Sequence, residues 1–208
     1  MKIIKPYFEI ETEIDGEKIL KNIEKIGRTC YKSENLITND SAAKFVKMLI
    51  NRGHEAMIEH ESITVRVICD RGIMAEITRH RIFSFAIEST RFCKYNKAKF
   101  GNELTFIEPC FWGNEKINMV HMWYKAMSFA EQQYMELIKA GATAQEARSI
   151  LPNSLKTEIV MTANLREWRH FFKLRTASEA HPQMREIAIP MLTKFKELIP
   201  VVFDDLEV

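Results

Sequence analysis

Residues 156–175 read KTEIVMTANLREWRHFFKLR, and the spacing of apolar residues changes part-way through this stretch. Residues 156–163 alternate in the manner of a half-buried strand. Asn164 then stands where a helix N-cap is needed, with Glu167 three positions later, in the arrangement of a capping box. We therefore predict a strand that passes directly into a helix over 165–175, which indicates a fold mixing sheet and helix.

The same kind of reading extends to the rest of the chain. The run SITVRVICD at 62–70 alternates as a second half-buried strand, and apolar residues recur at helical spacing within 16–28. Two further strands are predicted, an edge strand within 2–10 that contains Pro6 and a strand over 103–109. In the first half of the chain we predict a helix from about Ser41 that Gly53 closes, and a short helix over 73–80 followed by a loop. In the second half we predict a long helix over 115–140 ended by Gly141, a helix over 144–150 and a helix over 182–197.

These elements predict the class and the domain organisation. No internal repeat, low-complexity run or linker interrupts the chain. We predict one α+β domain over 1–208, in which helices pack around a small, mainly antiparallel sheet. No G-x-G-x-x-G or Walker sequence is present, so we expect neither a Rossmann nor a P-loop fold.

Composition limits the possible partners. The 208 residues are 46% hydrophobic and 28% charged, with a formal net charge of only +2, which argues against a general nucleic-acid binder. The four cysteines form no C-x-x-C pair and suit free thiols in a reducing compartment. There is neither a signal-peptide pattern nor an apolar run long enough for a membrane span. We therefore expect a cytoplasmic protein without a nucleic-acid or membrane partner.

Cationic side chains nevertheless gather at one place, in RHRIFSFAIESTRFCKY at 79–95. Arg79, His80 and Arg81 could be a solvated helix end, where cations favour the helix dipole. However, adjacent helical residues diverge by about 100°, so the three cannot face one way unless the chain leaves the helix there. The apolar residues that follow also argue against a solvated strip, which leaves a local anion site as the alternative.

A second polar stretch, GHEAMIEH at 53–60, contains two histidines, a residue type that often binds zinc. A helical zinc motif needs two histidines four apart, whereas His54 and His60 are six apart and would point about 240° around a helix. We therefore predict no metal site. The stretch is either a polar loop or a loop that aims His54 and Glu59 at a ligand.

Arginine recurs in separate segments that follow. Arg148 precedes a Leu-Pro stop, while Arg166, Arg169 and Arg175 lie on or just beyond one short helix. The guanidinium group suits phosphate oxygens. From the residues alone, the chain is either an enzyme with phosphorylated ligands or a nucleotide-binding module.

The stretch at 79–95 resembles the signature of the flavin-dependent thymidylate synthases, R-H-R-x-x-S-x-x-x-x-S-x-R-[YF]. Arg79, His80, Arg81, Ser84, Ser89 and Arg91 fall on its fixed positions. GHEAMIEH resembles an upstream flavin-contacting loop of that family, and EARSILP and NLREWRHFFKLRTASEAHPQMREIA resemble its C-terminal nucleotide and flavin segments. The resemblance thus covers about residues 50–195 in the family's order.

This resemblance implies a reaction and an assembly. The enzyme would methylate C5 of dUMP to give dTMP, with methylenetetrahydrofolate as the one-carbon donor. FAD would deliver a hydride after reduction by NADPH, and no metal would be needed. The family is homotetrameric with shared active sites, so arginines from distant segments could converge on one site.

The resemblance also implies roles for individual residues. Positions that hold FAD correspond to His54, Ala56, Glu59, Arg79, His80, Arg81, Ile82, Asn164, Arg166 and His170. Positions that bind dUMP correspond to Glu76, Glu88, Ser89, Thr90, Arg91, Arg148 and Arg175. Ser89 and Arg175 are the expected catalytic residues. We expect Ser89 to orient or polarise the pyrimidine rather than attack it, because a serine nucleophile needs an adjacent base.

Three positions depart from the family pattern. Ala86 and Ile87 stand where polar residues are common, and Phe92 replaces a usual tyrosine. These departures motivate an alternative, a non-catalytic nucleotide-binding protein of the same fold. A third possibility, an RNA- or DNA-binding module using residues 79–81, is disfavoured by the near-neutral charge.

Overall fold

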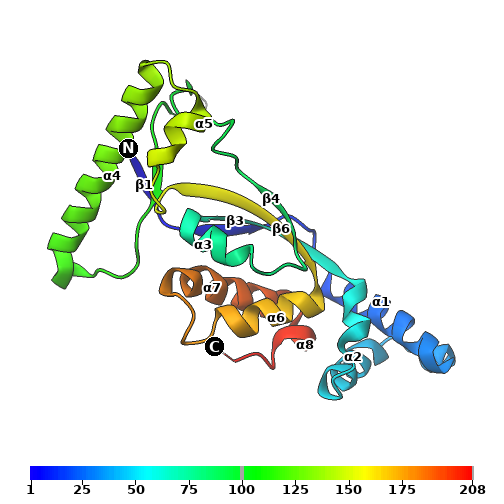
Figure 1. The fold of residues 1–208 in the computed structure, drawn as a ribbon. Helices are drawn as coiled ribbons and strands as arrows, with labels where there is room; N and C mark the ends of the chain where they lie inside the picture. Colours follow the sequence, from blue (N-terminus) through cyan, green and yellow to red (C-terminus); the bar gives the residue numbers. More distant parts are fainter. Residues whose placement is uncertain (99–100, 208) are drawn as a thin grey trace. The chain divides into compact units, whose positions relative to one another are not determined.

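The computed structural model describes residues 1–98 and 101–207 (Figure 1). Its strands are β1 (Lys2–Ile4), β2 (Tyr7–Ile10), β3 (Ser62–Asp70), β4 (Ser84–Ile87), β5 (Thr105–Ile107) and β6 (Lys156–Asn164). Its helices are α1 (Gly16–Arg28), α2 (Ser41–Asn51), α3 (Arg71–Ile77), α4 (Ile117–Lys139), α5 (Ala144–Ala147), α6 (Leu165–Arg175), α7 (Pro182–Leu198) and α8 (Pro200–Phe203). Short 3-10 turns are η1 (Thr29–Tyr31), η2 (Glu34–Leu36), η3 (Glu55–His60), η5 (Asn114–Lys116) and η6 (Arg148–Ile150).

The strands form one four-stranded sheet and one two-stranded sheet. The larger sheet has the order β2-β3-β6-β4. The side chain of Thr64 in β3 bonds to that of Thr162 in β6, and the side chain of Arg66 bonds to that of Glu158. Residue numbers of the paired positions therefore rise along β3 while they fall along β6. These two strands are therefore antiparallel. In the smaller sheet β1 pairs with β5 in parallel. The predicted α+β class, with a small and mainly antiparallel sheet, is confirmed.

Contacts divide the chain into two compact units. Unit 1 consists of Met1–Phe8, Arg66–His80 and Phe85–Val160. Unit 2 consists of Glu9–Val65, Arg81–Ser84 and Met161–Val208. Boundaries fall inside β2, β3, β4 and β6, so each strand of the larger sheet supplies residues to both units.

The core of unit 2 is aromatic and lies on α6, α7 and α8. Trp168 and Phe172 stack with ring centroids 5.7 Å apart, and Phe195 contacts both rings. Phe83, from the segment after α3, packs edge-on against Trp168 at 4.9 Å. Burial of each such ring stabilises the fold by roughly 1.5–3 kcal/mol, so these contacts anchor α6 firmly.

Unit 1 has a second, smaller core. Its buried members are Tyr95, Leu104, Phe106, Met127, Tyr134, Ala147 and Leu155. Met127 and Tyr134 are the residues that α4 buries, and their seven-residue spacing places them on one narrow stripe. Much of the apolar surface of α4 is therefore exposed.

Several predicted boundaries agree with the structure. The helices over 16–28 and 165–175 and the strand over 62–70 have the bounds that their spacing and caps predict. Gly53 and Gly141 follow the ends of α2 and α4 with positive φ angles of 70° and 100°, as helix-closing glycines do. Within the described residues, no helix combines the length and the apolar character needed to cross a bilayer.

Other predictions were wrong. Residues 84–87 form strand β4, not a loop, and join the larger sheet beside β6. The strand expected within 2–10 is two strands, because Pro6 lies between β1 and β2 and these join different sheets. The short helix α3 ends at Ile77 rather than near residue 80. The chain therefore leaves the helix before Arg79, and His80 is buried while Arg79 and Arg81 are exposed.

Candidate active site

A polar pocket of about 570 Å³, which we call the α6 pocket, lies in unit 2 beside the first turns of α6. Asn164 starts the helix by accepting a 2.9 Å hydrogen bond from the backbone N–H of Glu167. The pocket is lined by Glu55, Glu59, Ile82, Asn164, Arg166, Glu167, Arg169, His170 and Lys173. It thus combines η3, the segment after α3, and one face of α6.

The sequence of α6 explains why this face is polar. Arg166, His170 and Lys173 are exposed and follow one another at intervals of four and three, so they share a side of the helix. Trp168, Phe171 and Phe172 lie on the buried side. The aromatic core therefore fixes the direction in which the three cationic or protonatable side chains point.

Two arginines of α6 meet carboxylates in different ways. Arg166 is 52% exposed and lies 2.5 Å from Glu59 and 3.7 Å from Glu55. Arg169 is only 2% exposed and donates two hydrogen bonds to Asp205, at 2.6 and 2.7 Å, and one to Glu55 at 3.2 Å. The hydrogen bonds and charge of Arg169 lower the pKa of Asp205. Arg169 thus forms buried contacts that stabilise the fold, whereas the side chain of Arg166 is exposed to the pocket and to solvent.

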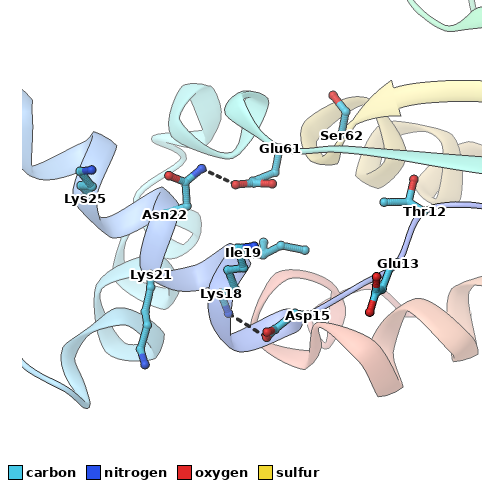
Figure 2. A pocket seen from close by; sticks show the side chains of 10 residues that line it. All are labelled: Thr12, Glu13, Asp15, Lys18, Ile19, Lys21, Asn22, Lys25, Glu61 and Ser62. Atoms are coloured by element: carbon cyan, nitrogen blue, oxygen red, sulfur yellow. Dashed lines mark hydrogen bonds between the residues drawn. The ribbon is translucent and has the colours of Figure 1, made fainter.

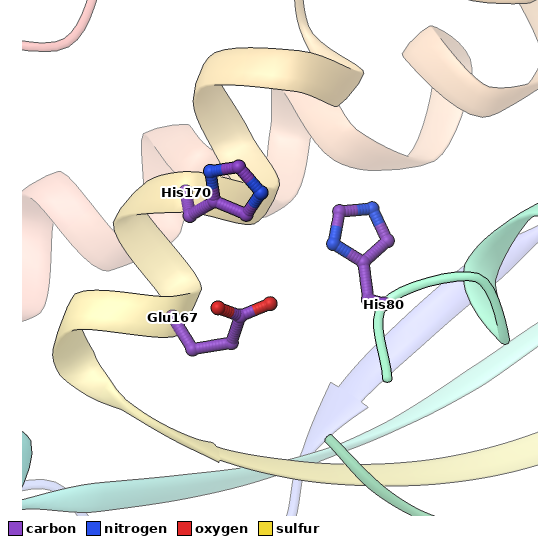
Figure 3. A group of neighbouring side chains, drawn as sticks. All are labelled: His80, Glu167 and His170. Atoms are coloured by element: carbon purple, nitrogen blue, oxygen red, sulfur yellow. The ribbon is translucent and has the colours of Figure 1, made fainter. Parts of the chain in front are cut away.

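Glu167 and His170 leave α6 toward the same side, one turn apart (Figure 3). Burial raises the pKa of the Glu167 carboxyl, and the electrostatic interaction with His170 acts in the opposite direction. A carboxyl group with a raised pKa in a pocket is a frequent feature of functional sites.

In unit 1, the loop after β4 meets η6 and α5. Arg148 donates a 3.5 Å hydrogen bond to the Thr90 hydroxyl, and Arg91 Nε donates a 3.0 Å hydrogen bond to Gln145. The Ser89 hydroxyl accepts a bond from the backbone N–H of Arg91, at 3.4 Å. The loop thus carries a serine, a threonine and an arginine beside a second arginine.

Comparison with known proteins shows which family this chain belongs to. A family model described as "Thymidylate synthase complementing protein" matches residues 14–201. The flavin-dependent thymidylate synthase of Pyrococcus abyssi is 34% identical over 170 residues, covering 80% of this chain and 68% of the relative. That of Corynebacterium efficiens is 31% identical over 217 residues, covering 95% and 83%. This chain belongs to the flavin-dependent thymidylate synthase family.

Comparison with solved structures shows that the fold of this chain is also shared. The crystal structure of the UMP/dUMP methylase PolB from Streptomyces cacaoi, bound with 5-Br dUMP, superimposes with a TM-score of 0.81. The alignment covers 98% of this chain and 96% of that one, at 22% identity. The resemblance seen in residues 79–95 is therefore confirmed at the level of family, enzyme class and fold.

The structure of this family member places the expected flavin residues in several positions. Five of them line the α6 pocket, namely Glu59, Ile82, Asn164, Arg166 and His170. His54 and Ala56 line another pocket of unit 2, of about 490 Å³, together with residues of η1 and α2 and with Gly27 of α1. Arg79 and His80 follow α3 in unit 1, and Arg81 belongs to unit 2.

The expected dUMP residues are distributed in the same way. Glu76 lies on α3, Glu88, Ser89, Thr90 and Arg91 follow β4, and Arg148 begins η6, all in unit 1. Arg175 ends α6 in unit 2. The structure therefore groups Thr90 with Arg148 by a direct hydrogen bond, and the roles of the whole set stay predictions.

Some residues of these sites were not foreseen. Glu55 and Lys173 line the α6 pocket, and helical spacing gave a signal for Lys173 because it lies one turn after His170. Tyr95 and Lys156 bond to Glu88 in unit 1. No local pattern indicates that contact, because Lys156 is 68 residues from Glu88.

Another pocket of unit 2, of about 690 Å³, contains none of the expected residues (Figure 2). It lies along α1, where Lys18, Lys21 and Lys25 are mixed with Asp15, Glu13 and Glu61. Its charges are of both signs, and a bond between Asn22 and Glu61 crosses it. The volume of a pocket alone therefore does not identify the candidate site.

Proposed function

We propose that this chain methylates C5 of dUMP to give dTMP, with FAD as cofactor, methylenetetrahydrofolate as one-carbon donor and NADPH as reductant. The observation that carries the proposal is the α6 pocket, in which five residues expected from the signature and its flanking segments lie together. Relatives named flavin-dependent thymidylate synthase support it. So does the likeness in fold to a protein named as a UMP/dUMP methylase.

The residues of the α6 pocket fit FAD chemically. Its volume lies within the range of roughly 300–1,000 Å³ that is usual for ligand sites. The exposed cations Arg166 and Lys173 suit a diphosphate, since hydrogen bonds between charged donors and phosphate oxygens are strong. Glu55 and Glu59 suit the hydroxyl and amino groups of a dinucleotide. Once bound and reduced, the flavin would supply the hydride.

We assign dUMP to Glu76, Ser89, Thr90, Arg91, Arg148 and Arg175, together with Glu88. In unit 1 the acceptors that hold Arg91 and Arg148 are the amide oxygen of Gln145 and the hydroxyl of Thr90, and neither is charged. By contrast, Arg169 is matched by carboxylates. The positive charges of Arg91 and Arg148 therefore suit a phosphate dianion or the carbonyl oxygens of uracil.

The expected contribution of these residues is electrostatic. Uracil C5 becomes a better nucleophile as negative charge develops on the ring, and fixed donors aimed at the carbonyl oxygens stabilise that charge. In this proposal Ser89 orients the pyrimidine, and Arg175, the second catalytic residue, stabilises the developing charge. The main tasks of the protein are then to orient two ligands and to exclude water.

We also propose a homotetramer in the cytoplasm. The cysteines Cys30, Cys69, Cys93 and Cys110 are all free thiols, which supports a reducing compartment. The expected site residues are spread over both units and several segments, which agrees with sites completed by neighbouring copies. Sedimentation or light scattering of the purified protein tests the assembly.

The exposure of three residues supports an alternative, a nucleotide-binding protein without catalytic activity. Ala86, Ile87 and Phe92 are all exposed, so each could face a ligand without the polar group that is common in the family. A protein of this kind would bind dUMP but release no tritium from [5-³H]dUMP.

The test uses the visible spectrum and product formation. Purified protein should be yellow, or become so with added FAD, and NADPH should bleach the flavin absorbance. With dUMP and methylenetetrahydrofolate present, it should form dTMP. Protein that cannot be loaded with FAD would contradict the proposal, and flavin binding with neither dTMP nor tritium release would favour the alternative.

A matched variant tests the role of Ser89. Ser89→Ala should lower turnover by about a hundredfold or more, because an orienting hydrogen bond in the transition state is lost. FAD content should not change, because Ser89 belongs to the loop after β4 and not to the α6 pocket. Unchanged turnover would show that Ser89 is not a catalytic residue.

A further inference from the structure

Glu88 is held on both of its carboxylate oxygens. The Tyr95 hydroxyl donates to Oε1 at 2.9 Å, and Lys156 Nζ donates to Oε2 at 2.8 Å. The side chain of Glu88 is 12% exposed, and that of Lys156 is 23% exposed. All three residues belong to unit 1, and all three line one pocket of about 370 Å³. This is a largely desolvated ion pair with an added hydrogen bond.

These contacts close the loop that carries the expected nucleotide residues. The residues between Glu88 and Tyr95 include Ser89, Thr90 and Arg91. Backbone N–H groups of Phe92 and Cys93 bond to the Ser89 carbonyl, at 3.2 and 3.0 Å, and form a turn. The Tyr95–Glu88 bond spans that turn, so it limits the number of conformations open to the loop.

Each end of the closed loop is attached to a rigid part of unit 1. Tyr95 is 5% exposed and belongs to the core cluster with Phe106 and Tyr134. Lys156 is the first residue of β6, and it also lies 3.4 Å from Glu158, which pairs with Arg66 of β3. The carboxylate of Glu88 is therefore linked to the core on one side and to the sheet on the other.

The protonation states favour a persistent contact. Burial and the Glu88 carboxylate raise the pKa of Tyr95, so its hydroxyl remains a donor at neutral pH. Burial alone would lower the pKa of Lys156, but its bonds to Glu88 and Glu158 outweigh this and raise it. Lys156 is therefore charged across the neutral range.

We propose that Tyr95 and Lys156 are positioning residues that fix Glu88 and thereby hold Ser89, Thr90 and Arg91 in place for the nucleotide. The inference rests on the proposed function, because the loop has to bind dUMP for its position to matter. Neither Tyr95 nor Lys156 needs to contact the substrate for this role. Each acts through Glu88, whose oxygens have further lone pairs that could still accept a bond from the ligand.

Two substitutions remove the contacts one at a time. Tyr95→Phe keeps the ring in the core and loses only the hydroxyl, and Lys156→Met loses the charge while keeping the side-chain length. Tyr95→Phe removes one hydrogen bond to Glu88, and Lys156→Met removes the bond to Glu88 together with the longer one to Glu158. Because each variant loses a hydrogen bond to a charged group, we expect the KM for dUMP to rise about tenfold or more. The FAD content should stay that of the wild type, because neither residue lines the α6 pocket.

Two controls separate positioning from general damage. Tyr124→Phe removes a hydroxyl from an exposed tyrosine of α4 and should leave the KM unchanged. Lys156→Arg retains a charged donor and should recover most of the affinity that Lys156→Met loses. Since both residues act through Glu88, the double variant Tyr95→Phe/Lys156→Met should lose less than the product of the two single losses.

Hydrogen exchange supplies a readout that does not depend on turnover. In Tyr95→Phe the amides of Phe92 and Cys93 should exchange at least about tenfold faster than in the wild type, because the loop opens more often. If wild-type protein forms no dTMP, the proposed function fails, and the exchange rates still test the loop. Wild-type exchange rates and a wild-type KM in both variants, with only the melting temperature changed, would overturn the inference and leave a purely structural contact.

Discussion

Arg169 is a single buried side chain that joins three segments of unit 2. It lies on α6, and its guanidinium group meets Glu55 of η3, Asp205 near the end of the described chain and the carbonyl oxygen of Val202. Arg169→Met would leave these groups without their partner. Because the site is buried, we expect a loss of about 3–5 kcal/mol in the free energy of unfolding, measured by urea denaturation.

Arg166→Met is the matched control for that substitution. Arg166 lies three residues away on the same helix and also pairs with carboxylates, but it is 52% exposed. Solvent screens such a pair, so the loss of stability should be much smaller than in Arg169→Met. Its effect should fall on FAD affinity instead. Equal losses of stability in the two variants would contradict this assignment of roles.

Asp205 gives the Arg169 contact a defined pH dependence. Arg169 lowers the pKa of Asp205 in the folded protein below its ordinary value of 3.8. The unfolded state then binds more protons than the native state between the two pKa values, so this contribution is present above the unfolded pKa. It is lost as the pH falls through the folded pKa.

The measurement compares wild-type protein with Asp205→Asn from pH 6 to pH 2. The stability difference between them should shrink as the pH falls below about 4, because the wild type loses the charge that the variant lacks. Glu167 has a raised pKa and acts with the opposite sign, but it is common to both proteins and cancels in the difference. A constant difference down to pH 2 would show that Asp205 contributes no pH-dependent stability.

Individual site residues were predictable only where chemistry and spacing coincided. Resemblance gave Asn164, Arg166 and His170, which do line one pocket, because Asn164 caps the short helix that carries the other two. It could not give the Tyr95–Glu88–Lys156 contact, which depends on how the loop after β4 meets the first residue of β6. Contacts of that kind arise from tertiary packing and have no local signal.

At the scale of elements, local signals fixed the bounds of those with strong caps. The helix α6 begins where Asn164 caps it, and α1 begins after Asp15, whose side chain accepts a bond from the N–H of Lys18. The strand β4 was missed because four residues, apolar in three positions, carry no clear alternation. Its strand geometry comes from pairing with β6, which the sequence does not display.

The helix α4 leads to a prediction about assembly. Met119, Met122, Phe129 and Leu137 are exposed, and helical spacing places them within about 80° of one another. A stripe of this kind suits contact with another copy of the chain. Phe129→Glu should therefore dissociate the proposed homotetramer, because an unpaired carboxylate would be desolvated in the interface.

Ser128→Glu is the control for α4. It adds the same charge at the neighbouring exposed position, about 100° further around the helix and away from the apolar stripe. Light scattering should find the wild-type mass for Ser128→Glu and a smaller mass for Phe129→Glu. If both variants keep the wild-type mass, the stripe on α4 is not an interface.

At the scale of the whole molecule, the question is whether the two compact units behave as one domain. Each has its own buried cluster, aromatic in unit 2 and mixed in unit 1. However, β3 and β6 pass through the boundary between the units, so unfolding of either one would remove paired residues from strands that the other needs. We therefore predict that the chain unfolds as a single cooperative domain.

Calorimetry of the FAD-free protein decides this. One transition is expected, with calorimetric and van't Hoff enthalpies that agree per cooperative unit, and far-ultraviolet and near-ultraviolet circular dichroism should give the same midpoint. Tyr95→Phe alters only unit 1 and Arg169→Met alters only unit 2, so each should lower the one midpoint without splitting the transition. Two transitions, each shifted by only one of these variants, would show that the units are separate domains, and that strands shared along the chain do not suffice to couple them.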